Sequence, residues 1–214
     1  HAFFKACLFL GSGSVIHGLH GEQDMRKMGG LRKAMPITFW TMMISTLAIA
    51  GIFPFAGFWS KDEILMVAFE HNKVLWVVAS IASIMTAFYM FRLMYLTFFK
   101  DFRGTEEQKH HLHESPSLIT IPLVILAILA LIGGAINLPG STWLNHFLEP
   151  ILSGKHEEHA FGSQEYTLMG IAMAGAVFGI IWAYSKYIKQ AFVPKEDGEI
   201  AGLSKVIYNK YYVD

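Results

Sequence analysis

Five long apolar stretches alternate with polar connections along the chain. A membrane-spanning helix needs about 20 mostly apolar residues, because the hydrocarbon core is about 30 Å thick and a helix rises about 1.5 Å per residue. The pattern therefore predicts an all-α membrane protein, a polytopic transmembrane helix bundle within residues 1–189. A polar cytoplasmic segment at 190–214 would lead to further C-terminal elements. The predicted spans cover about residues 1–17, 37–69, 74–99, 117–138 and 166–188.

The second apolar stretch, residues 37–69, is too long for one straight helix. As a single helix it would measure about 50 Å, against a hydrocarbon core of about 30 Å. Gly51, Pro54 and Gly57 lie in its middle, where proline removes a backbone donor and glycine weakens a helix. We therefore expect a discontinuous, broken helix with an unwound centre. Such breaks occur in membranes where the freed backbone groups face protein or a wet cavity, and they recur at transport sites.

Lysine and arginine are distributed unevenly between the connections. In membrane proteins, the cytoplasmic connections carry the excess of these residues. With five spans, twelve cations lie on the side that holds the 18–36 connection and three lie on the other, so the first side is predicted to be cytoplasmic. The first set is Arg26, Lys27, Arg32, Lys33, Lys100, Arg103, Lys109, Lys186, Lys189, Lys195, Lys205 and Lys210, and the second is Lys61, Lys73 and Lys155.

Composition agrees with a membrane protein and argues against several other classes. Only 16% of the residues are charged, whereas soluble domains average about a quarter. The 17 basic and 17 acidic residues give no basic field of the kind that binds nucleic acid. With Cys7 as the one cysteine and no dinucleotide fingerprint, we expect no flavin, iron–sulfur cluster, quinone or thiolate metal site in this chain. Because His1 opens the chain inside an apolar stretch, we expect the sequence to be internal to a longer protein.

Lys5 is the first candidate for chemistry, because it lies inside an apolar stretch. It precedes His17 by about 18 Å of helix, which places it near the bilayer midplane. A lysine there costs at least about 2.5 kcal/mol to insert, so it should face a cavity or a partner. His1 lies four residues earlier on the same helix face, and a desolvated lysine and a histidine both exchange protons near neutral pH. The pair predicts a proton relay; the alternative is a lysine that pairs with an acidic residue for assembly alone.

Lys61 is the second candidate, and its sequence neighbours allow two interpretations. Together with Asp62 and Glu63 it could form an interfacial charge cluster that closes a span. A break near residues 51–57 would instead return Lys61 towards the membrane interior. The excess length of the stretch leaves these interpretations in balance.

The histidines of the connections also allow more than one interpretation. His110, His111 and His113 lie in a polar connection, where we expect a solvated loop rather than a metal site. His17 and His20 flank the end of the first span. They are either proton acceptors at the cytoplasmic mouth or ordinary interface residues.

Three strings in the first third of the chain resemble a known protein family. They are HAFFKACLFLGSGSVIHG at 1–18, MRKMGGLRKAMPIT at 25–38 and FPFAGFWSKDEIL at 53–65. In order and spacing they resemble the largest antiporter-like subunit of respiratory complex I, which is chain L of bacterial NADH:quinone oxidoreductase and chain 5 of mitochondria. The resemblance is specific over residues 1–65 and weaker beyond, where the hydropathy agrees.

The resemblance implies a role for each candidate residue. His1 and Lys5 match the family's histidine and lysine of a half-channel, with Lys5 as a central proton carrier. Lys61 matches the lysine of the broken twelfth helix, which passes protons towards the periplasm. Phe53 replaces the first of two prolines usual at the break, so unwinding would depend on the neighbouring glycines and the remaining proline. The family's Glu–Lys pair of the earlier half-channel and its lateral helix have no counterpart in this chain.

The resemblance also implies a function, a location and partners. The chain would belong to a multi-pass subunit of the bacterial inner membrane that moves protons across the lipid bilayer without doing redox chemistry itself. NADH, FMN, iron–sulfur clusters and quinone would act in other subunits. Its partners would be other membrane-arm subunits, especially the adjacent antiporter-like one. Alternatives are a subunit of a multi-subunit sodium/proton antiporter, a subunit of the photosynthetic plastoquinone oxidoreductase, and a structural membrane subunit whose charges only pair.

Overall fold

All regular secondary structure in the described part of the chain is helical. The computed structural model describes residues 1–137, 147, 150, 163–193 and 200–213. The predicted all-α class is confirmed. The α-helices are α1 (Ala2–Gly18), α2 (Pro36–Ala50), α3 (Ala56–His71), α4 (Lys73–Phe98), α5 (Glu106–His110), α6 (Ser117–Ile132), α8 (Ser163–Tyr184) and α9 (Leu203–Tyr208). Shorter 3-10 turns cover Met25–Lys27, Gly133–Asn137 and Lys210–Tyr212, and a π-helical turn covers Ser185–Lys189.

Helices occupy each of the five stretches that the hydropathy pattern selected. Among the described residues, the segments Lys73–Phe98, Ser117–Ala135 and Glu165–Lys189 are long and apolar enough to cross a membrane, and α1 and α2 are shorter apolar helices. The number of crossings stays a prediction, and Leu138, Lys155 and Lys195 lie outside the described residues. The pattern did not predict α5 in the 100–116 connection or α9 in the polar segment.

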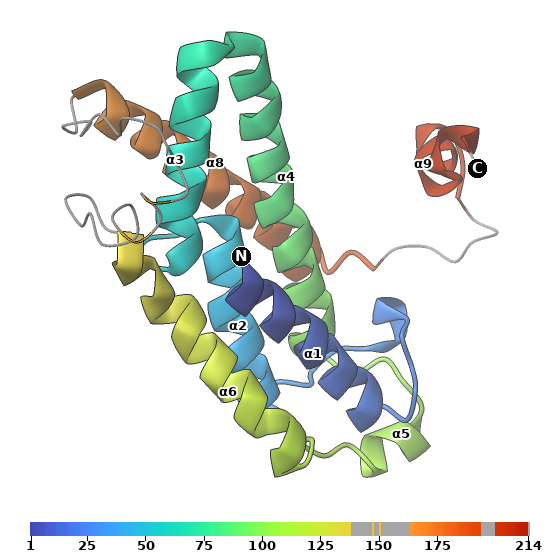
Figure 1. Cartoon of the computed structure of the whole chain (residues 1–214). Coiled ribbons are helices and arrows are strands. Elements are labelled where there is room, and N and C mark those ends of the chain that lie inside the picture. The colour runs from blue at the N-terminus through green and yellow to red at the C-terminus, as the bar shows by residue number, and fades with distance from the viewer. Residues whose placement is uncertain (138–146, 148–149, 151–162, 194–199, 214) are drawn as a thin grey trace.

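The helices form two groups that meet at the break between α2 and α3 (Figure 1). α1, α2 and α6 pack against one another, while α4 runs beside both α2 and α3 and has α8 on another side. Small residues allow the closest of these approaches. A Cβ atom at Gly179 would lie 2.7 Å from the Ile84 carbonyl oxygen, so α8 can touch the backbone of α4 only because that residue is glycine.

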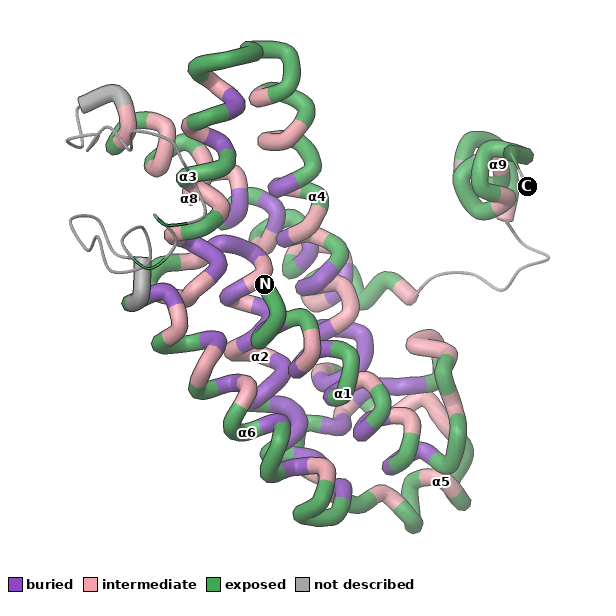
Figure 2. The backbone as a smooth tube through the Cα atoms, in the orientation of Figure 1, coloured by how far each residue is buried: buried purple, intermediate pink, exposed green. Residues whose placement is uncertain are grey.

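Burial is concentrated on α2 and on the sides of α1 and α4 that face it (Figure 2). The outer faces of α4, α6 and α8 carry large exposed apolar side chains, including Val74, Leu118 and Phe178. Leu118 is 86% exposed. Contiguous apolar surface of this kind needs lipid or neighbouring helices to cover it. The exposure therefore fits an integral membrane protein.

The predicted break falls between α2 and α3. Gly51 ends α2 in the left-handed conformation, with a φ of 77°, which glycine adopts without a steric penalty. Its N–H donates a hydrogen bond to the Ala48 carbonyl oxygen at 3.0 Å. The peptide bond between Phe53 and Pro54 is cis, and α3 begins at Ala56. The broken-helix prediction is confirmed.

Arg103 fastens the 18–36 connection to the end of α4. Its guanidinium donates hydrogen bonds to the carbonyl oxygens of Met25 at 3.0 Å, Arg26 at 2.9 Å and Leu96 at 2.7 Å. Burial lowers the pKa of Arg103, although a guanidinium stays protonated at neutral pH. Backbone N–H groups of residues 30–32 donate hydrogen bonds to carbonyl oxygens of residues 97–99. The connection therefore packs closely onto the end of the bundle that was predicted to be cytoplasmic.

Candidate functional site

Lys61 lies in the second turn of α3 and folds back over the helix break. Its Nζ donates a hydrogen bond to the Ala50 carbonyl oxygen at 3.3 Å. Gly51 makes room for this path, because a Cβ atom there would lie 2.9 Å from Lys61 Cδ. The lysine is half-buried. This geometry favours the interpretation in which Lys61 belongs to the break over that of a separate interfacial charge cluster.

The end of α2 leaves acceptors available to this ammonium group. The last four carbonyl oxygens of a helix have no partner within the helix, and Ala50 is the final residue of α2. A hydrogen bond from an ammonium group is stronger than one between neutral groups. A carbonyl oxygen accepts a hydrogen bond without taking up the proton. The break can therefore hold a protonated lysine in place and leave its proton free to move to water or to a carboxylate.

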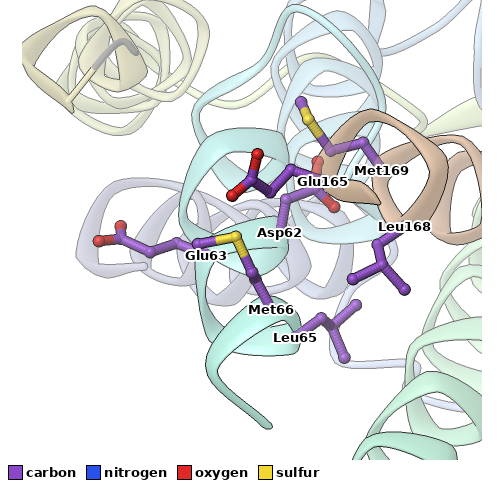
Figure 3. A pocket seen from close by; sticks show the side chains of 7 residues that line it. All are labelled: Asp62, Glu63, Leu65, Met66, Glu165, Leu168 and Met169. Atoms are coloured by element: carbon purple, nitrogen blue, oxygen red, sulfur yellow. The ribbon is translucent and has the colours of Figure 1, made fainter. Parts of the chain in front are cut away.

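A small pocket lies between α3 and α8, and Asp62, the residue after Lys61, is one of three acidic residues among its mainly apolar lining (Figure 3). Its volume of about 30 Å³ is enough for a water molecule. Asp62 contributes a buried carboxylate oxygen that has no hydrogen-bond partner in the described structure. Glu165 was missed from sequence, because nothing in its local pattern relates it to α3, about a hundred residues earlier. The lining residues are Asp62, Glu63, Leu65, Met66, Glu165, Leu168 and Met169.

His1 and Lys5 lie at the start of α1, one helical turn apart. The His1 ring stacks on the Phe4 ring, with centroids 5.2 Å apart, and the Lys5 side chain is exposed. Phe4 is buried against Ala48, so this turn of α1 packs against the end of α2 that leads into the break. The structure thus brings the backbone of the pair close to the break. No hydrogen bond joins Lys5 to Lys61 in the part of the chain that the structure describes.

Histidines from the end of α1 and from the two connections that follow α1 and α5 lie close together at the Arg103 end of the bundle. The His17 and His113 rings lie 6.0 Å apart between centroids, and those of His20 and His111 lie 5.6 Å apart. All four are exposed. Among the residues described, no group of three or more histidine, cysteine or acidic side chains is arranged to hold a metal ion. The sequence separated these residues by about ninety positions and gave no sign that they meet.

Comparison with known proteins supports one family. The family model described as "NADH:quinone oxidoreductase/Mrp antiporter, TM" matches residues 1–86. The chain is 45% identical over its whole length to NAD(P)H-quinone oxidoreductase chain 5 of a Picosynechococcus species, of which it covers 37%. It is 40% identical over its whole length to chain 5 of a Synechocystis species, of which it covers 38%. Against NADH-quinone oxidoreductase subunit L of Mycobacterium tuberculosis it is 43% identical over 87% of its length, and covers 30% of that protein.

The chain thus spans less than two fifths of the length of these curated relatives. The matched family model covers α1, α2, α3 and the first half of α4, which are the helices around the break. Relatives at 36–47% identity carry the names subunit L, subunit 5 or chain 5. The chain therefore belongs to the antiporter-like membrane subunits of NADH:quinone oxidoreductases, the family of subunit L and chain 5.

Proposed function

We propose that this chain is part of a subunit that moves protons across the membrane while an NADH:quinone oxidoreductase reduces quinone. The observation that carries the proposal is the Lys61 ammonium, which lies on the open carbonyl end of a broken helix. Unwound backbone that coordinates a cation is the arrangement used at transport sites in membranes. The subunit would act as a translocase within the enzyme, and this chain alone would not be catalytic.

His1, Lys5 and Lys61 are the residues we propose to carry the proton. Lys61 would hold it at the break, and its sequence neighbour Asp62 lines a water-sized pocket between α3 and α8. Lys5 and His1 share one face of α1 near the same end of α2 and would relay protons towards or from that point. Lysine and histidine suit this task because each can gain and lose a proton near neutral pH when its surroundings favour it.

The cofactors and partners of the proposal lie outside this chain. The one cysteine of this chain cannot supply the four thiolates of an iron–sulfur cluster. We propose that NADH, FMN, iron–sulfur clusters and quinone act in other subunits. The partners would be other membrane-arm subunits, the adjacent antiporter-like subunit among them. We place the protein in the bacterial inner membrane, with the Arg103 end of the bundle in the cytoplasm because it carries most of the cations.

Purification of the full-length subunit from its native membrane tests this function. We expect an affinity-tagged subunit to bring with it a complex that reduces quinone and pumps protons. A complex that exchanges sodium for protons without reducing quinone would contradict the proposal and favour the autonomous antiporter. An assembled enzyme whose pumping does not depend on this subunit's titratable residues would favour a structural subunit.

Replacing Lys5 by alanine in the full-length subunit should reduce the proton-pumping rate of the assembled enzyme by about tenfold. Positioned proton-transfer groups typically contribute more than this, about 10²–10⁴-fold, but water can partly replace a side chain that is as open as Lys5. Pumping by inverted membrane vesicles, followed with a pH-sensitive dye, measures the change. The control is Lys33→Ala, which removes an exposed lysine from the 18–36 connection. Wild-type pumping by the assembled Lys5→Ala enzyme would exclude Lys5 from the relay.

A further inference from the structure

An apolar groove lies between α2 and α6, which run side by side from the Arg103 end of the bundle (Figure 1). Its volume is about 350 Å³, and almost all of its lining is apolar. Thr41 and Ala127 are buried and form its floor. Trp40 is 55% exposed and Ile128 is 50% exposed, so these larger side chains line its sides. Open apolar surface of this kind needs an apolar occupant to cover it.

The length and width of the groove suit an acyl chain. On α2 the groove extends from Pro36 to Ile44, which is about 12 Å of helix, and half of a hydrocarbon core measures about 15 Å. Over that length, the volume corresponds to a cross-section of about 30 Å², whereas a helix about 10 Å across needs about 80 Å². The groove is therefore too narrow for a helix, and it is about as long as one leaflet is thick.

Arg32 lies at the end of the groove where α2 begins. Its guanidinium carbon lies 5.1 Å from the centroid of the Phe39 ring, and 6.0 Å and 5.9 Å from those of Trp40 and Phe99. A guanidinium over aromatic rings is attracted by their negative faces. Because Trp40 also lines the groove, these rings place a positive charge at its mouth. Tryptophan is the residue that membrane proteins favour at the level of the lipid headgroups.

The charge of Arg32 is left without an acidic partner by the described part of the chain, and its side chain is exposed. Glu114 lies at the same end of α2, but its carboxylate oxygens accept hydrogen bonds from the Ile37 N–H at 2.7 Å and the Thr38 hydroxyl at 2.6 Å. An arginine fork binds phosphate oxygens in pairs. Basic sites beside helices at the cytoplasmic surface bind anionic lipid headgroups. The chemistry at the mouth of the groove therefore matches the headgroup of a lipid whose chain would fit inside.

We propose that the groove between α2 and α6 binds one anionic phospholipid, whose phosphate contacts Arg32 and whose acyl chain lies along the groove. The lipid is held at both ends, by a charge-assisted contact at the headgroup and by burial of its chain. It therefore exchanges with the surrounding bilayer more slowly than a lipid on the outer faces of the bundle. The inference goes beyond the proposed function and requires only that α2 and α6 lie in the membrane.

Photo-crosslinking tests the headgroup contact. The assembled enzyme with its full-length subunit is placed in phosphatidylcholine vesicles that contain a small share of phosphatidylglycerol with a photoactivatable acyl chain. We expect label in residues 36–44 and 124–131, and a several-fold loss of it in Arg32→Gln. The matched control is Lys33→Gln, which removes the neighbouring exposed charge and should keep the wild-type label. Equal labelling of Arg32→Gln and the wild type, or equal loss in both variants, would overturn the proposal.

A second pair of variants tests the acyl-chain contact. Val124→Phe fills part of the groove, so the label in residues 36–44 should fall, whereas Ile125→Phe adds the same bulk at an exposed position of α6 outside the groove and should leave the label unchanged. A high-resolution map of the unaltered enzyme covers variants that do not assemble: it should show lipid density between α2 and α6. A protein segment in the groove, or no density, would overturn the proposal. These readouts are lipid contacts, so the inference can fail while the proposed function stands.

Discussion

Replacement of Lys61 by alanine in the full-length subunit is expected to lower the proton-pumping rate of the assembled enzyme by about 100-fold, the lower part of the range for a positioned proton-transfer group. The expected loss of pumping is larger than for Lys5→Ala, because Lys61 donates a hydrogen bond to the Ala50 carbonyl at the break and is half-buried. The coupled quinone reductase rate should fall with it. NADH-driven acidification of inverted membrane vesicles measures the first rate, and NADH oxidation measures the second.

The variant Lys61→Arg separates a proton carrier from a structural charge. An arginine keeps the positive charge and can still donate to the Ala50 carbonyl, but it does not release its proton at physiological pH. We therefore expect Lys61→Arg to assemble and yet fail to pump. Lys73→Ala is the control, since it removes an exposed lysine at the start of the next helix. Restored pumping in Lys61→Arg would mean that the charge alone matters.

Gly57→Ala is expected to have the largest effect on assembly. A Cβ atom at this position would overlap the Ala48 carbonyl oxygen, which belongs to the backbone of α2 and cannot rotate away as a side chain can. Overpacking against well-ordered groups costs about 1–3 kcal/mol, and a backbone overlap lies at the upper end or beyond. The first turn of α3 would have to move away from α2, and the Lys61 site with it. We expect less assembled complex on native gels and a lower temperature of thermal inactivation.

Gly170→Ala is the matched control for this substitution. A Cβ atom at Gly170 would meet no other atom within 4 Å in the structure, and alanine favours helix over glycine by about 1 kcal/mol. This variant should assemble at least as well as the wild type. Equal thermal stability of Gly57→Ala and the wild type would show that α2 and α3 are not packed as closely in the enzyme as they are here.

The helix break could be predicted from the sequence, because the length of the apolar stretch alone excluded a single straight helix. The stretch 37–69 exceeds a membrane's thickness, and the two glycines and the proline in its middle marked where the helix stops. The structure ends α2 at Ala50 and starts α3 at Ala56, within that region. The left-handed conformation at Gly51 follows from the same local chemistry. These are all short-range effects, which a single sequence records.

The contacts that build the site could not be read from sequence, because they depend on how the helices are rotated. The pattern left Lys61 between two interpretations, since a helix rotated by half a turn would point the lysine away from Ala50. Glu114 binds the first turn of α2 from 76 residues away, and Glu165 shares a pocket with Asp62 across an even longer separation. Hydropathy records which residues avoid water and does not record which of them meet.

The interrupted helix also has an electrical consequence. α2 directs its carbonyl end, with a partial negative charge of about half an elementary charge, at the same short segment to which α3 directs its positive N–H end. The ammonium of Lys61 is attracted to the first and repelled by the second, so its reach towards Ala50 is the orientation that both helix ends favour. A neutral amine feels neither end strongly. If Lys61 carries the proton as we propose, the two helix ends would hold its side chain at Ala50 while it is protonated and hold it less strongly once the proton has gone.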